Sequence, residues 1–77
     1  MVEEVIERLK EGMSEEDIAE WLASKMHSAE AIFAAASSLG SLGDDLDFEY
    51  GVQCGAIGDL LLPLARERLE QERGQSV

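Results

Sequence analysis

The chain has 77 residues, 45% of them hydrophobic, and a formal net charge of −11 from 17 Asp and Glu against 6 Lys and Arg. This length fits one small domain with a thin core, and the apolar content is too high for a disordered acidic tail. The charge repels nucleic acids and anionic membranes and favours basic partners. Because alanine and leucine dominate, we expect a single all-α domain over residues 1–77.

The first expected helix covers residues 2–11. Apolar residues between Val2 and Leu9 recur at spacings of three and four, beside a ridge of glutamates. Gly12 is a typical helix end, and Ser14 is a typical N-cap for the helix that follows.

The second expected helix covers residues 15–39. Its apolar residues from Ile18 to Ala36 step by four, four, three, four and three, which is one continuous helical stripe. A break near His27 stays open, because Ser28 could cap a new helix. Residues 37–44 contain two glycines and three serines, so we expect a loop there.

The third expected helix covers residues 45–73 and is capped by Asp44 or Asp45. Its apolar residues from Leu46 to Leu64 repeat the spacing of the second helix. Pro63 should kink it, and residues 74–77 should fray. The predicted architecture is a small three-helix bundle, with one short helix and two long antiparallel ones.

Gly51, Gly55 and Gly58 fall on one face of the third expected helix. Glycine inside a helix costs about 0.5–1 kcal/mol relative to alanine, so three on one face need a reason. Close contact between two helix backbones would supply it. The face is therefore predicted to pack a helix, either inside the chain or across a homodimer.

The sequence predicts neither an enzyme nor a cofactor. His27 and Cys54 are the only histidine and cysteine, and no glycine-rich phosphate loop is present. Asp45, Asp47 and Glu49 alternate like the opening of a calcium loop, but Tyr50 stands where that loop needs glycine, so no metal site is expected.

The expected location is the cytoplasm. A lone cysteine is typical of a reducing compartment, and no apolar run is long enough to cross a bilayer. Residues 28–36 resemble the second helix of a helix-turn-helix but offer a row of alanines instead of side chains for base edges. We therefore expect no direct nucleic-acid binding and no membrane binding.

The acidic residues gather in two blocks, which we expect to form a partner-binding patch. The first block consists of Glu3, Glu7, Glu11, Glu15, Glu16 and Glu20, and the second of Asp44, Asp45, Asp47 and Glu49. Aromatic residues commonly anchor protein interfaces. The candidate apolar anchors are Trp21, Phe48 and Tyr50.

In size and charge, the chain resembles small phage-encoded inhibitors of host defence, including anti-CRISPR proteins and DNA mimics, although no motif identifies a family. The resemblance implies a non-enzymatic protein that masks a basic, nucleic-acid-binding surface of another protein in the host cytoplasm. The alternative is a homo-oligomeric accessory or scaffold module, whose acidic surface serves only solubility.

Overall fold

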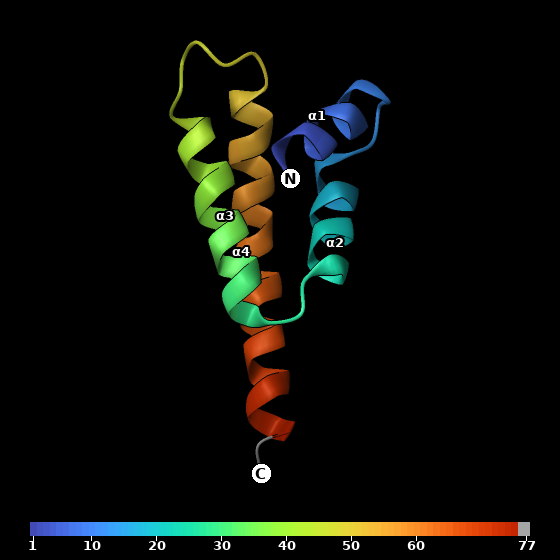
Figure 1. Cartoon of the computed structure of the whole chain (residues 1–77), viewed down its shortest axis with the longest axis vertical. Helices are drawn as coiled ribbons and strands as arrows, with labels where there is room; N and C mark the ends of the chain where they lie inside the picture. The colour runs from blue at the N-terminus through green and yellow to red at the C-terminus, as the bar shows by residue number, and fades with distance from the viewer. Residues whose placement is uncertain (76–77) are drawn as a thin grey trace.

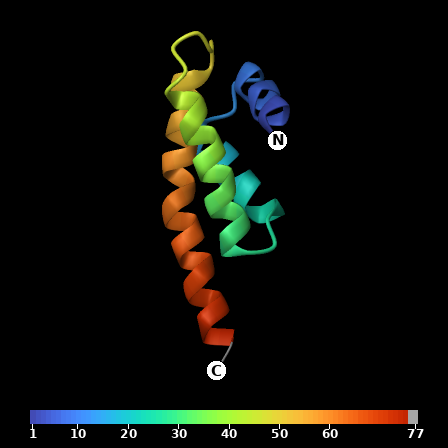
Figure 2. The ribbon, with the colours of Figure 1, turned by 60° about the vertical axis from the view of Figure 1, so that its left-hand side comes forward.

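The computed structural model describes residues 1–75, which confirm the expected all-α class. The helices are α1 (Val2–Lys10), α2 (Glu15–Lys25), α3 (Ala29–Gly43) and α4 (Gly51–Gln75) (Figure 1). α3 and α4 form a long antiparallel hairpin, α2 packs on α4, and α1 folds back on α2 (Figures 1 and 2). The molecule measures 46 × 23 × 16 Å. Within the described residues, no helix combines the length and apolarity that crossing a membrane requires.

The helix expected over residues 15–39 is two helices, so the described part of the chain has four helices where three were predicted. The chain leaves the helical conformation at Met26, and Ser28 starts α3 by accepting the N–H of Ala31 on its side-chain oxygen at 3.2 Å. Ser14 caps α2 in the same way, through the N–H of Asp17 at 3.1 Å. The break that was left open at His27 is therefore present, and its cause is a local cap.

The predicted stop of the first helix is confirmed within one residue. Gly12 has a φ of 90°, a left-handed conformation that other residues rarely adopt. The N–H of Gly12 donates to the carbonyl of Leu9, and the N–H of Met13 donates to the carbonyl of Arg8. This Schellman pattern satisfies the last carbonyls of α1 and turns the chain toward α2.

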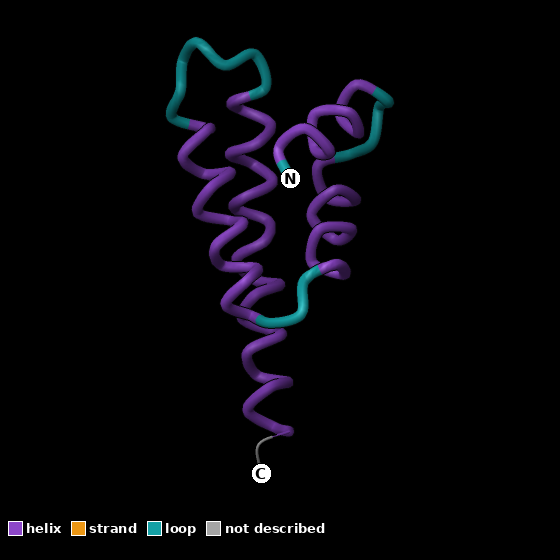
Figure 3. The backbone as a smooth tube through the Cα atoms, in the orientation of Figure 1, coloured by secondary structure: helices purple, strands orange, loops and turns teal. Residues whose placement is uncertain are grey.

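The loop predicted over residues 37–44 is wrong, because α3 continues to Gly43. Serine and glycine favour loops when they stand alone. Here the Ser41 hydroxyl donates to the carbonyl of Ser37 at 3.1 Å, so it bonds to its own helix and does not break it. The connection between the two long helices lies instead at residues 44–50 (Figure 3).

The predicted start of the last helix at residue 45 is also wrong, and neither Asp44 nor Asp45 caps it. α4 begins at Gly51, because the Asp45 carboxylate accepts the N–H of Asp47 at 3.0 Å and holds the chain in turns. At the other end, Gly74 belongs to α4. Residues 76–77, the rest of the expected frayed tail, lie outside the described residues.

The glycine face of α4 lies directly against α3. A Cβ added to Gly58 would stand 2.8 Å from the carbonyl oxygen of Ala36, and one added to Gly51 would stand 2.9 Å from that of Leu42. One added to Gly55 would stand 3.2 Å from the Cα of Gly43. The two backbones therefore approach within one chain, at a distance that only glycine allows.

The core follows the predicted stripes from α2 to the middle of α4. α3 contributes Ile32 and Leu39 to this core, together with three buried alanines that let neighbouring helices come close. The buried hydrophobic residues are Val5, Ile18, Ala19, Leu22, Ala23, Ala29, Ile32, Ala35, Ala36, Leu39, Cys54, Ile57, Leu61 and Ala65. Leu46, which was predicted to begin the stripe of the last helix, lies outside this core.

Side chains of α4 hold the junction between α2 and α3. The Arg68 guanidinium donates to the carbonyl of Met26 at 2.9 Å and to that of Ala23 at 3.4 Å. One turn later, the Glu72 carboxylate accepts the N–H of Ala29 at 3.0 Å. A cation thus meets the end of α2 and an anion meets the start of α3, which matches both helix dipoles.

Candidate functional site

The most distinctive surface is the end of the α3–α4 hairpin, residues 44–52, which we call the hairpin end. Two hydrogen bonds fix its turns: the N–H of Phe48 donates to the carbonyl of Asp45, and the N–H of Gly51 donates to that of Phe48. The second acidic block lies here, and all four of its side chains are exposed. These residues are Asp44, Asp45, Asp47 and Glu49.

Two aliphatic side chains of the hairpin end lie in water. Leu46 is 98% exposed and Val52 is 81% exposed, the highest values among the large hydrophobic residues of the described chain. Leu46 stands between Asp45 and Asp47, so carboxylates flank it on both sides. The sequence analysis assigned Leu46 to the core, because it lies four residues before Tyr50, and it did not single out Val52.

The aromatic residues of the hairpin end face the protein. Phe48 and Tyr50 are half-buried against the core, with their rings edge to face at a centroid distance of 6.5 Å. Such a pair stabilises the turn that carries it. The structure therefore uses these two predicted anchors at least partly for its own packing, whereas Leu46 is free to meet a partner.

A shallow open groove of about 430 Å³ lies on the α3–α4 hairpin, and the exposed Val52 is one of its lining residues. Small residues from both helices line it, together with two aspartates. The lining residues are Gly40, Gly43, Asp44, Val52, Gly55, Ala56 and Asp59. Gly43 and Gly55, whose backbones are in contact, thus also line this groove.

The first acidic block covers α1 and the start of α2. Glu3, Glu7 and Glu11 are exposed, as are Glu16 and Glu20 on α2. α1, the α1–α2 turn and the hairpin end all lie toward the same end of the long axis (Figures 1 and 2).

Two glutamates of α1 and α2 differ from the other acidic residues of these helices. Glu15 is only half-exposed. Glu4, which was not among the predicted partner residues, pairs with Lys25 at 3.2 Å, and this hydrogen bond and charge lower the pKa of its carboxyl.

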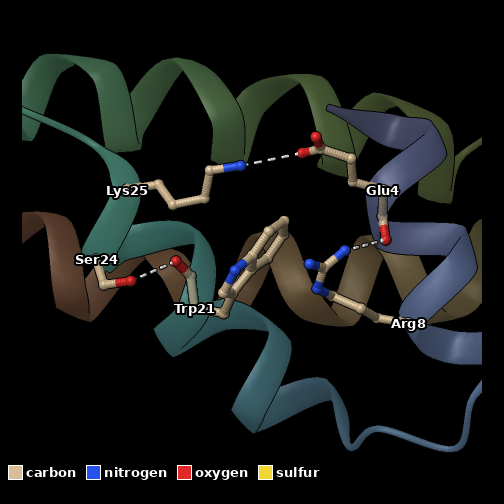
Figure 4. A network of polar contacts seen from close by, with 5 residues as sticks. All are labelled: Glu4, Arg8, Trp21, Ser24 and Lys25. Carbon is tan, nitrogen blue, oxygen red and sulfur yellow. Dashed lines mark hydrogen bonds and ion pairs between the residues drawn. The ribbon is translucent and has the colours of Figure 1, made fainter.

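The third predicted anchor, Trp21, is held by neighbours from its own chain (Figure 4). The Arg8 guanidinium lies 3.5 Å and the Lys25 ammonium 4.4 Å from the centroid of the indole ring. The Ser24 hydroxyl also donates to the Trp21 carbonyl at 2.7 Å. Cation–π contacts of this kind fasten α1 to α2, so the indole serves the fold.

The other chemistry-bearing residues do not come together. Cys54 is fully buried, and burial raises the pKa of its thiol, whereas His27 is exposed between α2 and α3. Over residues 1–75, no three His, Cys, Asp or Glu side chains are grouped in a way that could hold a metal ion.

Comparisons of the chain with protein-family models, with curated proteins and with solved structures give no match. The geometry and charge of the molecule are therefore the basis for inferring its function.

Proposed function

We propose that this chain is a non-enzymatic acidic binding protein that masks a basic surface of another protein, and that the hairpin end makes the contact. The observation that carries the proposal is Leu46, 98% exposed between Asp45 and Asp47 on a hydrogen-bonded turn. A leucine in water adds nothing to the core, but it can anchor a partner once carboxylates have steered that partner into place.

The distribution of cations supports this choice of surface. Arg8 and Lys25 engage Trp21, and Arg68 engages the junction of α2 and α3, so these three positive charges serve the fold. The four carboxylates of the hairpin end remain exposed. α1, which carries Glu3 and Glu7 of the first acidic block, lies toward the same end of the molecule and adds to the attraction at longer range.

The partner we propose is a cytoplasmic protein whose basic surface normally holds nucleic acid. Surfaces that bind phosphate backbones carry dense lysine and arginine, and carboxylates on a small rigid helical domain can take the place of the phosphates. Masking would then be competitive, because this chain and nucleic acid would bind the same lysine and arginine side chains of the partner.

The test begins with affinity purification from the source cell and identification of the retained protein by mass spectrometry. The triple reversal of Asp44, Asp45 and Asp47 to lysine should abolish binding of that protein. The matched control reverses Glu30, Glu67 and Glu70, which are exposed and lie outside both acidic blocks. Equal loss in both variants, or binding that nucleic acid does not compete with, would contradict the proposal.

A homodimer is the alternative for the same exposed apolar residues. Gly51, Gly55 and Gly58 already face α3, so a second copy would have to dock elsewhere, and it would bring the same negative charge. We therefore propose a monomer. Light scattering after size-exclusion chromatography tests this, and a stable dimer that Leu46→Ser dissociates would favour the oligomeric module.

A further inference from the structure

The strongest unassigned feature is the continuity between the exposed aliphatic residues of the hairpin end and the groove beside them. Val52 belongs to both, since it is 81% exposed and lines the groove. Asp44 also belongs to both, and it lies two residues before Leu46. A partner that covers Leu46 would therefore reach the groove with the adjoining part of its surface.

The groove has unusual chemistry for an apolar docking surface. Its floor is the bare backbone at Gly40, Gly43 and Gly55, and its charged groups are the carboxylates of Asp44 and Asp59. Among the described residues, no lysine or arginine lines it. Its charge is therefore complementary to a cation, and the space beside Gly40, where an added Cβ would meet nothing within 4 Å, is open to a side chain.

The end of α3 strengthens this complementarity. The last turns of α1, α2 and α4 each carry a basic residue, but the last turn of α3 has none and is followed by Asp44 and Asp45. The carbonyl end of a helix attracts positive charge. The α3 terminus, with Gly40 and Gly43 in the groove, thus adds to the field of the two carboxylates.

We infer that the groove receives an arginine side chain of the partner protein, next to an apolar side chain that packs on Leu46 and Val52. Arginine fits better than lysine, because its planar fork can donate two parallel hydrogen bonds to one carboxylate and its flat face can lie on exposed peptide groups. This inference rests on the proposed function and adds the specificity of its contact.

The test uses two peptides of equal charge, nona-arginine and nona-lysine, titrated into the ¹⁵N-labelled protein. Nona-arginine should bind roughly three- to tenfold more tightly, because only guanidinium bonds in the bidentate manner. The largest shifts should fall on the amides of Gly40, Gly43, Gly55 and Ala56. They should persist at physiological salt, where looser contacts with the first acidic block fade.

Three variants make the test specific. Asp44→Asn with Asp59→Asn should weaken nona-arginine binding about tenfold, because both carboxylates of the site are lost. The control, Glu67→Gln with Glu70→Gln, removes the same charge from exposed positions and should change affinity less than about twofold. Ala56→Leu fills the groove without changing charge and should weaken nona-arginine binding as well. Thermal melting verifies that each variant is folded.

Each outcome separates the two proposals. Equal binding of both peptides, with shifts spread over α1 and the hairpin end alike, overturns the arginine site and leaves electrostatic masking supported. Failure of both peptides to bind, even at low salt, overturns the masking function and the arginine site together. Self-association that Leu46→Ser abolishes overturns the site in favour of a second copy on this surface.

Discussion

The two ends of the α3 helix differ in the side chains and charges that lie next to them. At its start, Ser28 caps the backbone, Glu72 accepts a further N–H, and Arg68 closes the neighbouring α2 terminus. At its end, aspartates follow the last turn, and Leu46 projects into water. The same antiparallel hairpin thus has a matched end, at the start of α3, where side-chain charges suit the helix dipoles, and an opposite end where carboxylates follow the carbonyl terminus of α3.

The difference indicates where stability and binding reside. At the matched end, side chains of α4 hold the junction of α2 and α3, so substitutions of those side chains should lower the free energy of unfolding. The exposed residues of the hairpin end contribute little to the core, so substitutions of those residues should leave the free energy of unfolding unchanged. Functional surfaces often depart from the local rules that stabilise the rest of a fold.

The largest contrast is expected between two leucines. Leu39 is fully buried in α3, so Leu39→Ala should cost about 2–5 kcal/mol of unfolding free energy through lost burial and the cavity left behind. Leu46→Ala should change the same quantity by less than about 0.5 kcal/mol. Urea denaturation of both variants measures the difference, and similar losses would remove the distinction between the two regions.

The glycines provide the next contrast. Gly58→Ala should cost about 1–3 kcal/mol, because its Cβ would meet the Ala36 carbonyl oxygen at 2.8 Å. Gly40→Ala has nothing within 4 Å of its Cβ and should stabilise α3 by about 0.5–1 kcal/mol through helix propensity. Thermal melting of both variants measures these changes. An unchanged melting temperature in Gly58→Ala would show that the α3 and α4 backbones are not in contact there.

The matched end can be tested through Arg68. Arg68→Met keeps most of the apolar stem but removes both hydrogen bonds to the end of α2, so we expect a loss of about 1.5 kcal/mol. Arg66→Met, an exposed neighbour on the same helix, should stay within about 0.5 kcal/mol of the wild type. Chemical denaturation of both variants measures the contribution of the Arg68 hydrogen bonds. Equal losses in the two variants would show that these bonds do not stabilise the fold.

The smallest expected effect is a dependence of stability on alkaline pH. Burial raises the pKa of the Cys54 thiol, so the unfolded chain ionises first as pH increases. This contribution to stability is fully present below the unfolded value of about 8.5 and is lost as pH rises through the folded pKa. Denaturation curves across this window should show a decline that is absent in Cys54→Ala.

The sequence predicted the helical class, the first helix and most of the core, because these depend on apolar spacing and on caps such as Ser14 and Gly12. It misplaced the hairpin end. Serine and glycine at the end of α3 favour a loop locally, but the Ser41 hydroxyl bonds to its own helix and Gly43 packs on α4, so the segment is helical. Leu46 shares the spacing of the core stripe, but the Asp45 carboxylate accepts the N–H of Asp47 and holds Leu46 in a turn outside the helix.

The anchors illustrate the same limit. Trp21 was predicted to meet a partner because aromatic residues are common at interfaces, but the fold brings Arg8 and Lys25 onto its ring. Which apolar residues remain exposed depends on tertiary contacts that no spacing rule contains. The one sequence signal for the hairpin end is the leucine between two aspartates.

The most direct test of the central claim is the salt dependence of binding to the protein recovered by affinity purification. Between about 0.1 M and about 1 M salt, the Debye length falls from about 10 Å to about 3 Å, so exposed carboxylates lose most of their reach. Masking through the hairpin end predicts that affinity falls at least about tenfold over this range. An affinity that does not change with salt would contradict it.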